Sequence, residues 1–201
     1  MEFDIPAGNT RLYAACAEDD LLIPCPVVAP NSGGDLAEEA AQADEAIRHG
    51  AWAVWIRPAQ DYWLLAEWVC DDLFRALQER RLPVLCLERL VAPEQLAALA
   101  GRYPALPFIL AEGSYRNQRI YLPLLETFPN IYLSTGNNNI VYQGIEQMVR
   151  RVGAERLLFG TGFPGTEPMT AVTHLMYADL ADDQRQLIGA GNLLRLKEGI
   201  R

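Results

Sequence analysis

The residues best suited to chemistry in this sequence are a carboxylate and several guanidinium groups that follow apolar segments. Glu112 ends the segment LPFILAE (106–112), and Arg57, Arg89 and Arg116 follow this segment or its neighbours. A carboxylate beside a guanidinium could act as a general base or orient a polar ligand. The same pair could instead be a structural salt bridge. We take Glu112, Arg57 and Arg116 as candidate catalytic residues, with the salt bridge as the alternative.

A second group of polar residues lies in similar positions and could contact a ligand. The run SYRN (114–117) begins a predicted helix, so its N–H groups and Arg116 could face an anionic group, although helix capping explains it equally well. The run NNN (137–139) suits a loop before a helix. The candidate substrate-contacting residues are Glu88, Arg89, Tyr115, Asn117, Thr135, Asn137, Thr161 and Gly162.

The charge balance restricts the class of partner. The chain has 201 residues and a net charge of −9, without a basic cluster, which argues against nucleic acid or an anionic membrane surface. A small molecule or another protein is the expected partner. The apolar runs are too short to span a membrane, and residues 1–11 lack the layout of a signal peptide, so we expect a cytoplasmic protein.

Lysine, histidine and cysteine usage limits the possible catalysts. Lys197 is the only lysine and lies near the C-terminal end, which argues against a Schiff base or a carbamylated-lysine metal bridge. His49 and His174 lie in predicted helices, where a structural role is favoured over a catalytic one. The cysteines form no CxxC pair and predict neither a zinc site nor disulfides. They are Cys16, Cys25, Cys70 and Cys86.

The positioning elements form a repeated unit in which a helix is followed by an apolar strand. Four strands begin 23 to 26 residues apart, if Val84, Phe108, Ile131 and Leu157 are taken as their first apolar positions. That spacing fits parallel strands joined by crossover helices. Two earlier segments fit at wider spacing, which gives six strands. The predicted strands are 21–29, 53–58, 82–88, 106–112, 130–136 and 157–162.

The helices between these strands carry ordinary start and stop signals. Asp35 and Glu38 are in capping-box register, and Asp61 is a predicted cap for the next helix. Pro123 implies a kink or a late start in its helix, while Pro24 and Pro26 suit an edge strand. Periodicity alone does not separate an open sheet from a barrel. The predicted helices are 35–50, 61–81, 92–103, 116–128, 138–153 and 181–196.

Several segments resemble a known family. RRVGAERLLFGTGFP (150–164) is similar to the last barrel strand of the amidohydrolase-related family. LPVLCLE, PFILAEG, LLETFPNIYLSTG and GAGNLLRLKEG resemble its other strands and its closing helix, in the family's order. The resemblance covers about residues 21–201 and implies an α/β fold of the (βα)8 TIM-barrel type. We expect one partial barrel domain, 1–201, with about six βα units.

The resemblance also implies a metal site, and this sequence departs from its pattern. The family typically binds zinc or a related ion through a His-x-His pair after the first strand, histidines after the fifth and sixth, and an aspartate after the eighth. The first strand with its His-x-His pair is not found here. Leu87, Glu112 and Gly162 stand at the other positions. A tight zinc site usually needs three or four ligands, so we predict a degenerate site and no metal cofactor.

By resemblance, the expected activity is hydrolysis or decarboxylation of a small molecule. One alternative is an enzyme, either incomplete or working without metal through Glu112 with Arg57 or Arg116. The other is a non-catalytic barrel that binds a small molecule or a protein. Because six strands would leave the barrel open, we also expect a homo-oligomer or a partner that covers the sheet edges.

Overall fold

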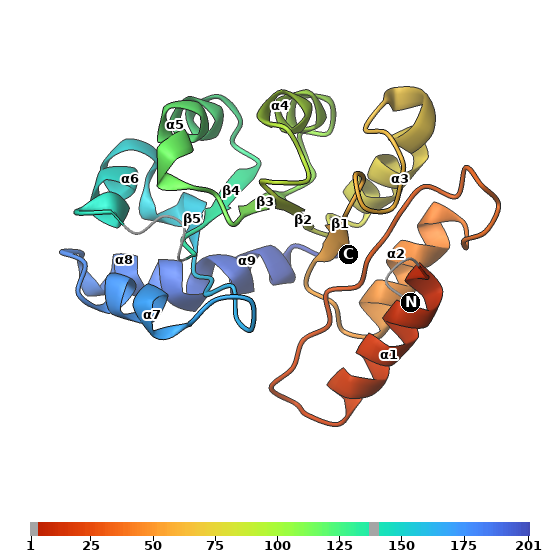
Figure 1. Cartoon of the computed structure of the whole chain (residues 1–201), viewed down its shortest axis with the longest axis horizontal. Helices are drawn as coiled ribbons and strands as arrows, with labels where there is room; N and C mark the ends of the chain where they lie inside the picture. Colours follow the sequence, from red (N-terminus) through yellow and green to blue (C-terminus); the bar gives the residue numbers. More distant parts are fainter. Residues whose placement is uncertain (1–3, 137–140) are drawn as a thin grey trace.

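The computed structural model describes residues 4–136 and 141–201. These residues contain a sheet of five parallel strands in the order β1-β2-β3-β4-β5 (Figure 1). Val84, Phe108 and Ile131 are paired across three neighbouring strands, as their repeat spacing predicts. The strands follow one another across the sheet in chain order, each joined to the next by a helix, and this is the arrangement of a partial TIM barrel. The strands are β1 (Val54–Ile56), β2 (Val84–Leu87), β3 (Phe108–Ala111), β4 (Ile131–Ser134) and β5 (Leu157–Leu158).

Helices cover both faces of this sheet. Figure 1 shows α3 to α6 on the outer face, α7 to α9 on the inner side, and α1 and α2 beside β1. A sheet buried on both faces explains why the strands are almost continuously apolar. The helices are α1 (Ile5–Ala17), α2 (Glu39–Arg48), α3 (Glu67–Glu79), α4 (Pro93–Arg102), α5 (Gln118–Thr127), α6 (Gly144–Val152), α7 (Met169–Met176), α8 (Asp182–Gln186) and α9 (Asn192–Glu198), with a π-helical segment at Leu187–Gly191.

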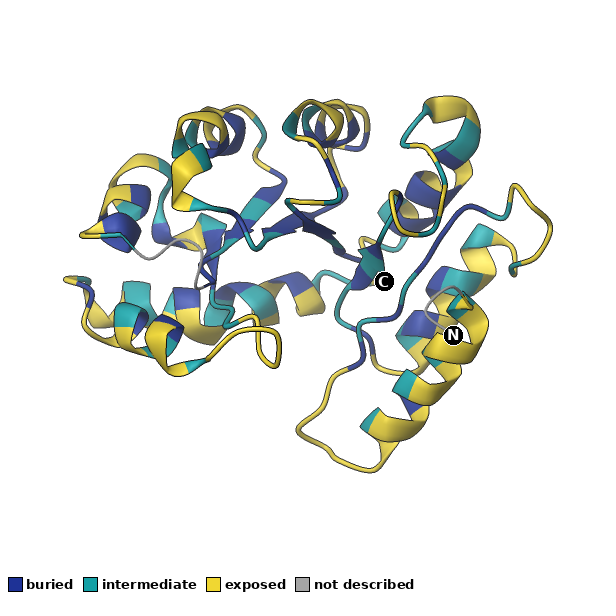
Figure 2. Cartoon of the chain, in the orientation of Figure 1, coloured by how far each residue is buried: buried dark blue, intermediate teal, exposed yellow. Residues whose placement is uncertain are grey.

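Side chains alternate between the two faces along each strand. The main core lies between the sheet and the outer helices and includes fully buried Ile56, Phe108 and Leu133 (Figure 2). A smaller cluster on the inner face joins Ile109 and Leu158 to Leu196 of α9. The C-terminal helix therefore fills part of the space that facing strands would occupy in a closed barrel.

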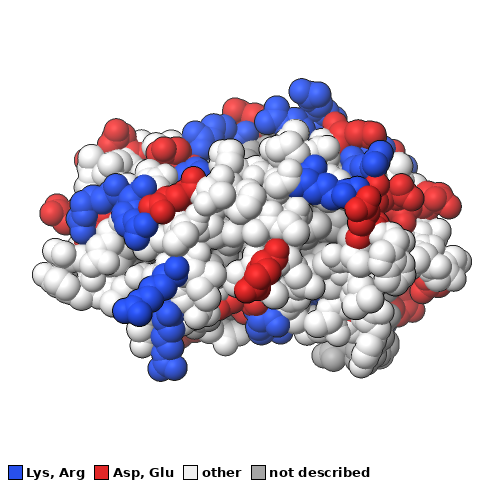
Figure 3. Space-filling model, turned by 90° about the horizontal axis from the view of Figure 1, so that it is seen from above, with Lys and Arg blue, Asp and Glu red and all other residues white. Residues whose placement is uncertain are grey.

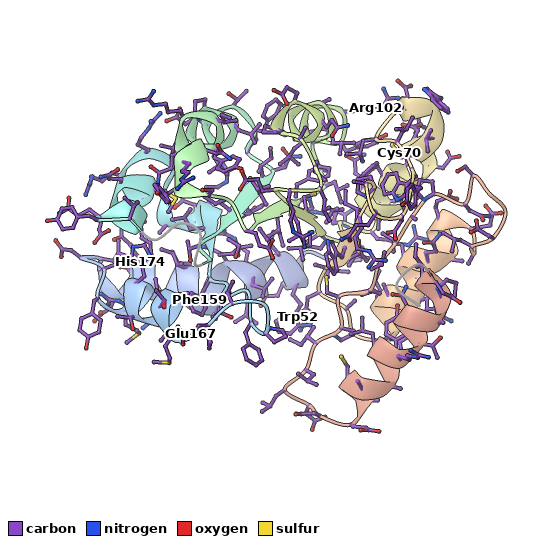
Figure 4. The ribbon with its side chains drawn as sticks, in the orientation of Figure 1. Trp52, Cys70, Arg102, Phe159, Glu167 and His174 are labelled. Atoms are coloured by element: carbon purple, nitrogen blue, oxygen red, sulfur yellow. The ribbon has the colours of Figure 1, made fainter. Side chains whose placement is uncertain are left out.

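Polar contacts fix α9 in that position. Asn192 is fully buried and donates from Nδ2 to the carbonyls of Ala154 (2.8 Å) and Leu157 (2.7 Å), next to β5. At the other end of the helix, Lys197 Nζ lies 5.7 Å from the ring centroid of Trp52, which precedes β1 (Figure 4). Helix α9 thus connects the two margins of the sheet.

The prediction of a strand at 21–29 is wrong. Within this segment only Val27 forms a bridge, to Trp55 of β1. Val28 N donates to Trp55 O at 3.0 Å, and Trp55 N donates to Pro26 O at 2.8 Å. Pro24 and Pro26 have no N–H to extend the ladder. The described chain consequently has five strands instead of six. Helix α1, which was not predicted, lies near this segment, and Asn9 Nδ2 donates to Val27 O at 2.8 Å.

Some predicted helix boundaries also differ from the structure. Helix α2 begins at Glu39, and its cap residue Glu38 makes no side-chain capping bond, so the box predicted from Asp35 does not form. Helix α3 begins at Glu67, and the predicted cap Asp61 is bonded to Arg57. Pro123 lies inside α5. The predicted helix 181–196 is divided into α8, the π-helical segment and α9, and residues 138–140 of another lie outside the described residues.

Ion pairs connect the outer helices. Acidic and basic side chains are interspersed over the face formed by α3 to α6 (Figure 3). Arg102 of α4 pairs with Glu67 of α3 and donates from Nε to Asp71 Oδ1 at 3.1 Å, where Tyr103 OH also donates at 2.6 Å. Hydrogen bonds from Tyr103, and then from Arg102 and Arg75, hold the pKa of Asp71 below its usual value. Within the described part of the chain, every helix is too short or too polar to cross a membrane.

Candidate functional site

A cleft of about 490 Å³ lies at the C-terminal ends of the strands, and we call it the strand-end cleft. Ligand sites of barrels and of parallel α/β sheets lie at this end, because the loops after each strand converge there. Every strand from β1 to β5, or the loop that follows it, contributes residues. The cleft is lined by Trp55, Leu85, Leu87, Arg89, Ala111, Glu112, Ser134, Gly136, Gly160, Thr161, Gly162, Phe163, Gly165 and Thr166.

Strand alternation selects most of this lining. Leu85, Leu87 and Arg89 are two residues apart and all line the cleft, as do Ser134 and Gly136. The neighbouring residue Thr135 is on the opposite side, is 2% exposed, and has its N–H bonded to Leu158 O at 2.8 Å. The cleft therefore has an apolar floor from the strands and a polar margin from the loops.

Glu112 reaches the cleft because its backbone is left-handed. Ile109 of β3 lies in the inner cluster and Ala111 lines the cleft, so an extended backbone would direct Glu112 to the outer face. Its φ of +59° changes that direction, and such a conformation costs a non-glycine residue about 1–3 kcal/mol. Glu112 Oε2 accepts a hydrogen bond from Arg89 Nε at 3.3 Å, and the two side chains are 41% and 55% exposed. A ligand can therefore reach both charged groups.

A glycine-rich loop forms the opposite margin of the cleft. A β-carbon at Gly160 would overlap Ser134 Oγ, so β5 approaches β4 closely there. Gly162 has a φ of +73°, and its carbonyl accepts from Thr166 N at 3.0 Å. Thr166 Oγ1 in turn donates to Thr161 O at 2.5 Å. The loop after β5 therefore closes on itself through Thr161 and Thr166.

The structure brings together only some of the predicted site residues. Arg89, Glu112, Thr161 and Gly162 line the cleft, together with Leu87. Trp55, Ser134 and Thr166 were not predicted. The signal for Trp55 and Ser134 was the period of two along their strands, whereas Thr166 lies in the loop after β5, where no such pattern applies. Asn137 lies outside the described residues.

Arg57 and Arg116 do not line the strand-end cleft. The Arg57 guanidinium donates from Nη2 to Asp61 Oδ1 at 2.9 Å and from Nε to Asp61 Oδ2 at 3.1 Å. Arg57 lines a neighbouring hollow instead. Arg116 is exposed, and its guanidinium lies 5.8 Å from the ring centroid of Tyr115. The arginine that lines the cleft and pairs with Glu112 is Arg89, so the prediction that Arg57 and Arg116 lie in the site is not confirmed.

Glu88 and Asn117 also form a structural contact away from the cleft. Glu88 Oε2 accepts from Ser114 N at 2.7 Å, and Oε1 accepts from Asn117 Nδ2. Ser114 caps the short helical turn Tyr115–Asn117 by accepting from Arg116 N at 3.3 Å. Burial, together with a hydrogen bond to Glu88, raises the pKa of Tyr121 well above the usual value. For the SYRN run (114–117), the structure therefore agrees with helix capping, the alternative to anion binding. Glu88 is an additional partner of this run.

The described lining does not fit the family's metal. Glu112 is its only carboxylate, Leu87 is apolar, and Gly162 has no side chain. Residues 4–136 and 141–201 contain no group of three or more His, Cys, Asp or Glu arranged to hold a metal ion. His49 stacks on Tyr13 with ring centroids 3.9 Å apart, and His174 belongs to α7, so neither lines the cleft.

Comparisons with known proteins place the fold and the sequence in one family. The sequence matches the family model described as Amidohydrolase over residues 7–196. No curated protein matches the sequence. Solved structures match the fold at low identity.

An uncharacterised TIM-barrel protein from Bordetella bronchiseptica is similar with a TM-score of 0.75 and 19% identity, over 95% of this chain and 72% of that chain. A 5-carboxyvanillate decarboxylase from Novosphingobium aromaticivorans, complexed with manganese and 4-hydroxy-3-methoxy-5-nitrobenzoic acid, has a TM-score of 0.77 and 15% identity, over 96% and 69%. The 2,6-dihydroxybenzoate decarboxylase from Rhizobium has a TM-score of 0.68 and 18% identity, over 96% and 76%. The chain belongs to the amidohydrolase family and has its TIM-barrel fold, of which the described residues form five parallel strands.

Proposed function

We propose that this protein is an amidohydrolase-family barrel with a degenerate metal site that binds a small aromatic carboxylic acid in the strand-end cleft. The observation that carries this proposal is the position of the Arg89–Glu112 pair, which lies over an apolar floor where the lining offers no set of metal ligands. The names of two structural relatives, decarboxylases of dihydroxybenzoate and carboxyvanillate, supply the ligand class.

The cleft walls suit the aromatic part of such a ligand. Trp55, Leu85 and Leu87 provide apolar surface deep in the cleft, and Ala111 leaves space beside them. Sites for small molecules commonly combine such a floor with a few polar groups that set the orientation. Ser134, Thr161 and Thr166 provide hydroxyl groups at the margin that can bond phenolic substituents.

Arg89 suits the carboxylate. Its guanidinium has a planar set of donors that matches a carboxylate in a bidentate geometry. In the unliganded chain Glu112 accepts one of these bonds at 3.3 Å, a long and half-exposed contact that a ligand can replace. If the ligand carboxylate takes the place of Glu112 as the hydrogen-bond acceptor, Arg89 remains paired with a carboxylate before and after binding.

A second candidate function is proton transfer by Glu112 without a metal. It is favoured by the strained backbone of Glu112, since left-handed non-glycine residues gather at functional sites. The Glu112 carboxylate lines the cleft and is 41% exposed, so it can reach a bound acid as a general base. Glu112→Gln separates the candidates, because it would abolish turnover but leave binding of the acid unchanged or stronger.

Calorimetric titration with 2,6-dihydroxybenzoate tests the proposed binding. We expect the full chain to bind the acid equally with and without EDTA. Arg89→Met should weaken binding by about tenfold or more, which corresponds to about 1.4 kcal/mol. Arg119→Met, which removes an exposed arginine of α5 outside the cleft, is the matched control and should leave binding unchanged. Loss of binding on adding EDTA, or equal binding by Arg89→Met, would overturn the proposal.

A further inference from the structure

A second pocket, of about 690 Å³, lies between α6 and α7, and we call it the α6–α7 pocket. It shares none of its lining residues with the strand-end cleft. Its volume is in the range of sites that take small organic molecules. Figure 4 shows His174 in the region between α6 and α7.

Glu146 brings a buried and incompletely bonded carboxylate to this pocket. The residue is 9% exposed and belongs to the first turn of α6. Its Oε1 accepts from Asp179 N at 2.9 Å, which fixes the carboxyl group. Its Oε2 is buried and has no hydrogen-bond partner among the residues that the structure describes. A buried carboxylate oxygen without a donor is costly, so a donor from outside the chain would stabilise it.

His174 adds two more unsatisfied atoms to the same pocket. Both ring nitrogens are buried, and neither has a partner within the described part of the chain. A neutral imidazole has one donor and one acceptor, and both must be satisfied when the ring is removed from water. Glu146 and His174 line the same pocket, so the unsatisfied carboxylate oxygen and the unsatisfied imidazole belong to one site.

The other residues that line the pocket indicate which charge and which kind of body a ligand should have. Asp179 is a second acidic residue at the pocket, and neither lysine nor arginine is among the described residues that line it. Tyr142, Met169 and Tyr177 form an apolar and aromatic wall that is otherwise exposed to solvent. Aromatic faces attract cations as well as apolar groups. The pocket is therefore complementary to a cation with an apolar body.

We propose that the α6–α7 pocket is a binding site for a protonated amine carried on an aromatic or apolar group. The ammonium group donates to Glu146 Oε2 and to the acceptor nitrogen of His174, and the apolar body lies against Tyr142, Met169 and Tyr177. This site is separate from the strand-end cleft, and the inference does not rest on the function proposed for that cleft.

Calorimetric titration of the full chain with 2-phenylethylamine tests the inference. We expect binding in the millimolar range or tighter. Glu146→Gln keeps an oxygen for Asp179 N but removes the charge, so it should weaken binding at least tenfold. Glu198→Gln removes an exposed charge at the end of α9 and should leave the affinity unchanged.

Two further measurements keep the test decisive if Glu146→Gln folds poorly. Thr173→Trp places a large ring at an exposed position in the pocket and should also abolish binding, with the thermal unfolding midpoint retained. The anion 3-phenylpropionate has a similar body and should not bind this pocket. Absence of amine binding, equal affinity in Glu146→Gln and Thr173→Trp, or equal binding of the anion at this pocket would overturn the inference.

Discussion

Gly162 lies so close to Thr166 that a β-carbon at position 162 would come within 2.6 Å of Thr166 Oγ1. The threonine has little freedom to move away, because its hydroxyl donates to Thr161 O and its N–H donates to Gly162 O. Gly162 stands where the resemblance places the family's metal-binding aspartate. A side chain at position 162 would therefore require Thr166 to move.

Substitution at Gly162 should reveal this packing. Gly162→Ala adds both a strained φ of +73° and the contact with Thr166. Gly34 has a similar φ of +70° with nothing within 4 Å of its β-carbon position, so Gly34→Ala measures backbone strain alone. We expect Gly34→Ala to cost about 1 kcal/mol and Gly162→Ala clearly more, by urea unfolding. Equal losses would show that Thr166 does not restrict the position.

The parts of the fold that could be predicted from the sequence are those where apolar strand segments recur at a spacing that leaves room for one helix. The regular spacing of Val84, Phe108 and Ile131 reflects one helix and two turns per unit, and these residues are in register. The segment 21–29 misled the prediction because its apolar character comes from burial against the sheet, while its prolines prevent pairing. Helix α1 was missed because Pro6 and Gly8 obscure its pattern, although Asp4 caps it by accepting from Ala7 N at 2.9 Å.

The candidate site was predictable in location but only partly in composition. Strand ends pointed to the correct edge of the sheet, since parallel strands finish together. The prediction of individual residues was wrong where strand alternation decides which face a side chain is on. Thr135 was predicted to contact substrate but is buried, whereas its neighbour Ser134 lines the cleft. Glu112 lines the cleft because its φ is left-handed, and no sequence pattern predicts that backbone conformation. The prediction also overlooked that Arg57 pairs with Asp61, four residues later in the chain.

Asn192 should hold α9 against the rest of the fold. We therefore expect the chain to unfold as one cooperative domain. Asn192→Ala leaves the carbonyls of Ala154 and Leu157 without their buried donor, at a cost of about 1–3 kcal/mol. Leu194→Ala on the exposed side of the same helix should change stability by less than about 0.5 kcal/mol. Urea unfolding monitored by tryptophan fluorescence and circular dichroism should give one transition. A separate early transition would argue against a single domain.

The hydroxyl of Tyr103 should make stability depend on pH through Asp71. The pKa of Asp71 is lower in the folded chain than its usual 3.8, with the Tyr103 bond as the largest cause, so its contribution is complete above about pH 5 and is lost as the pH falls through the folded pKa. Tyr103→Phe should therefore be less stable at pH 7 and approach the original protein near pH 2. Tyr177→Phe, at an exposed position, should show no such convergence. A constant difference for Tyr103→Phe across this range would contradict the assignment.

The open sheet leads us to predict self-association. Leu21, Leu22 and Ile23 are exposed directly before the segment that pairs with β1, which places apolar surface next to a sheet edge. Light scattering at micromolar concentration should give a multiple of the 22.4 kDa chain mass. Leu21→Glu should shift the population toward the monomer, whereas Leu64→Glu, at another exposed leucine, should not. A well-folded monomer for the unchanged protein would refute the prediction.

Metal content tests the central claim most directly. The strand-end cleft combines Leu87, Gly162 and a single carboxylate, Glu112, and we expect this donor set to hold no divalent ion tightly. Protein purified without chelator and analysed by plasma mass spectrometry should contain well under one equivalent of zinc, manganese or iron. Its affinity for 2,6-dihydroxybenzoate should be the same before and after EDTA treatment. One equivalent of metal per chain, lost together with ligand binding on chelation, would contradict the account.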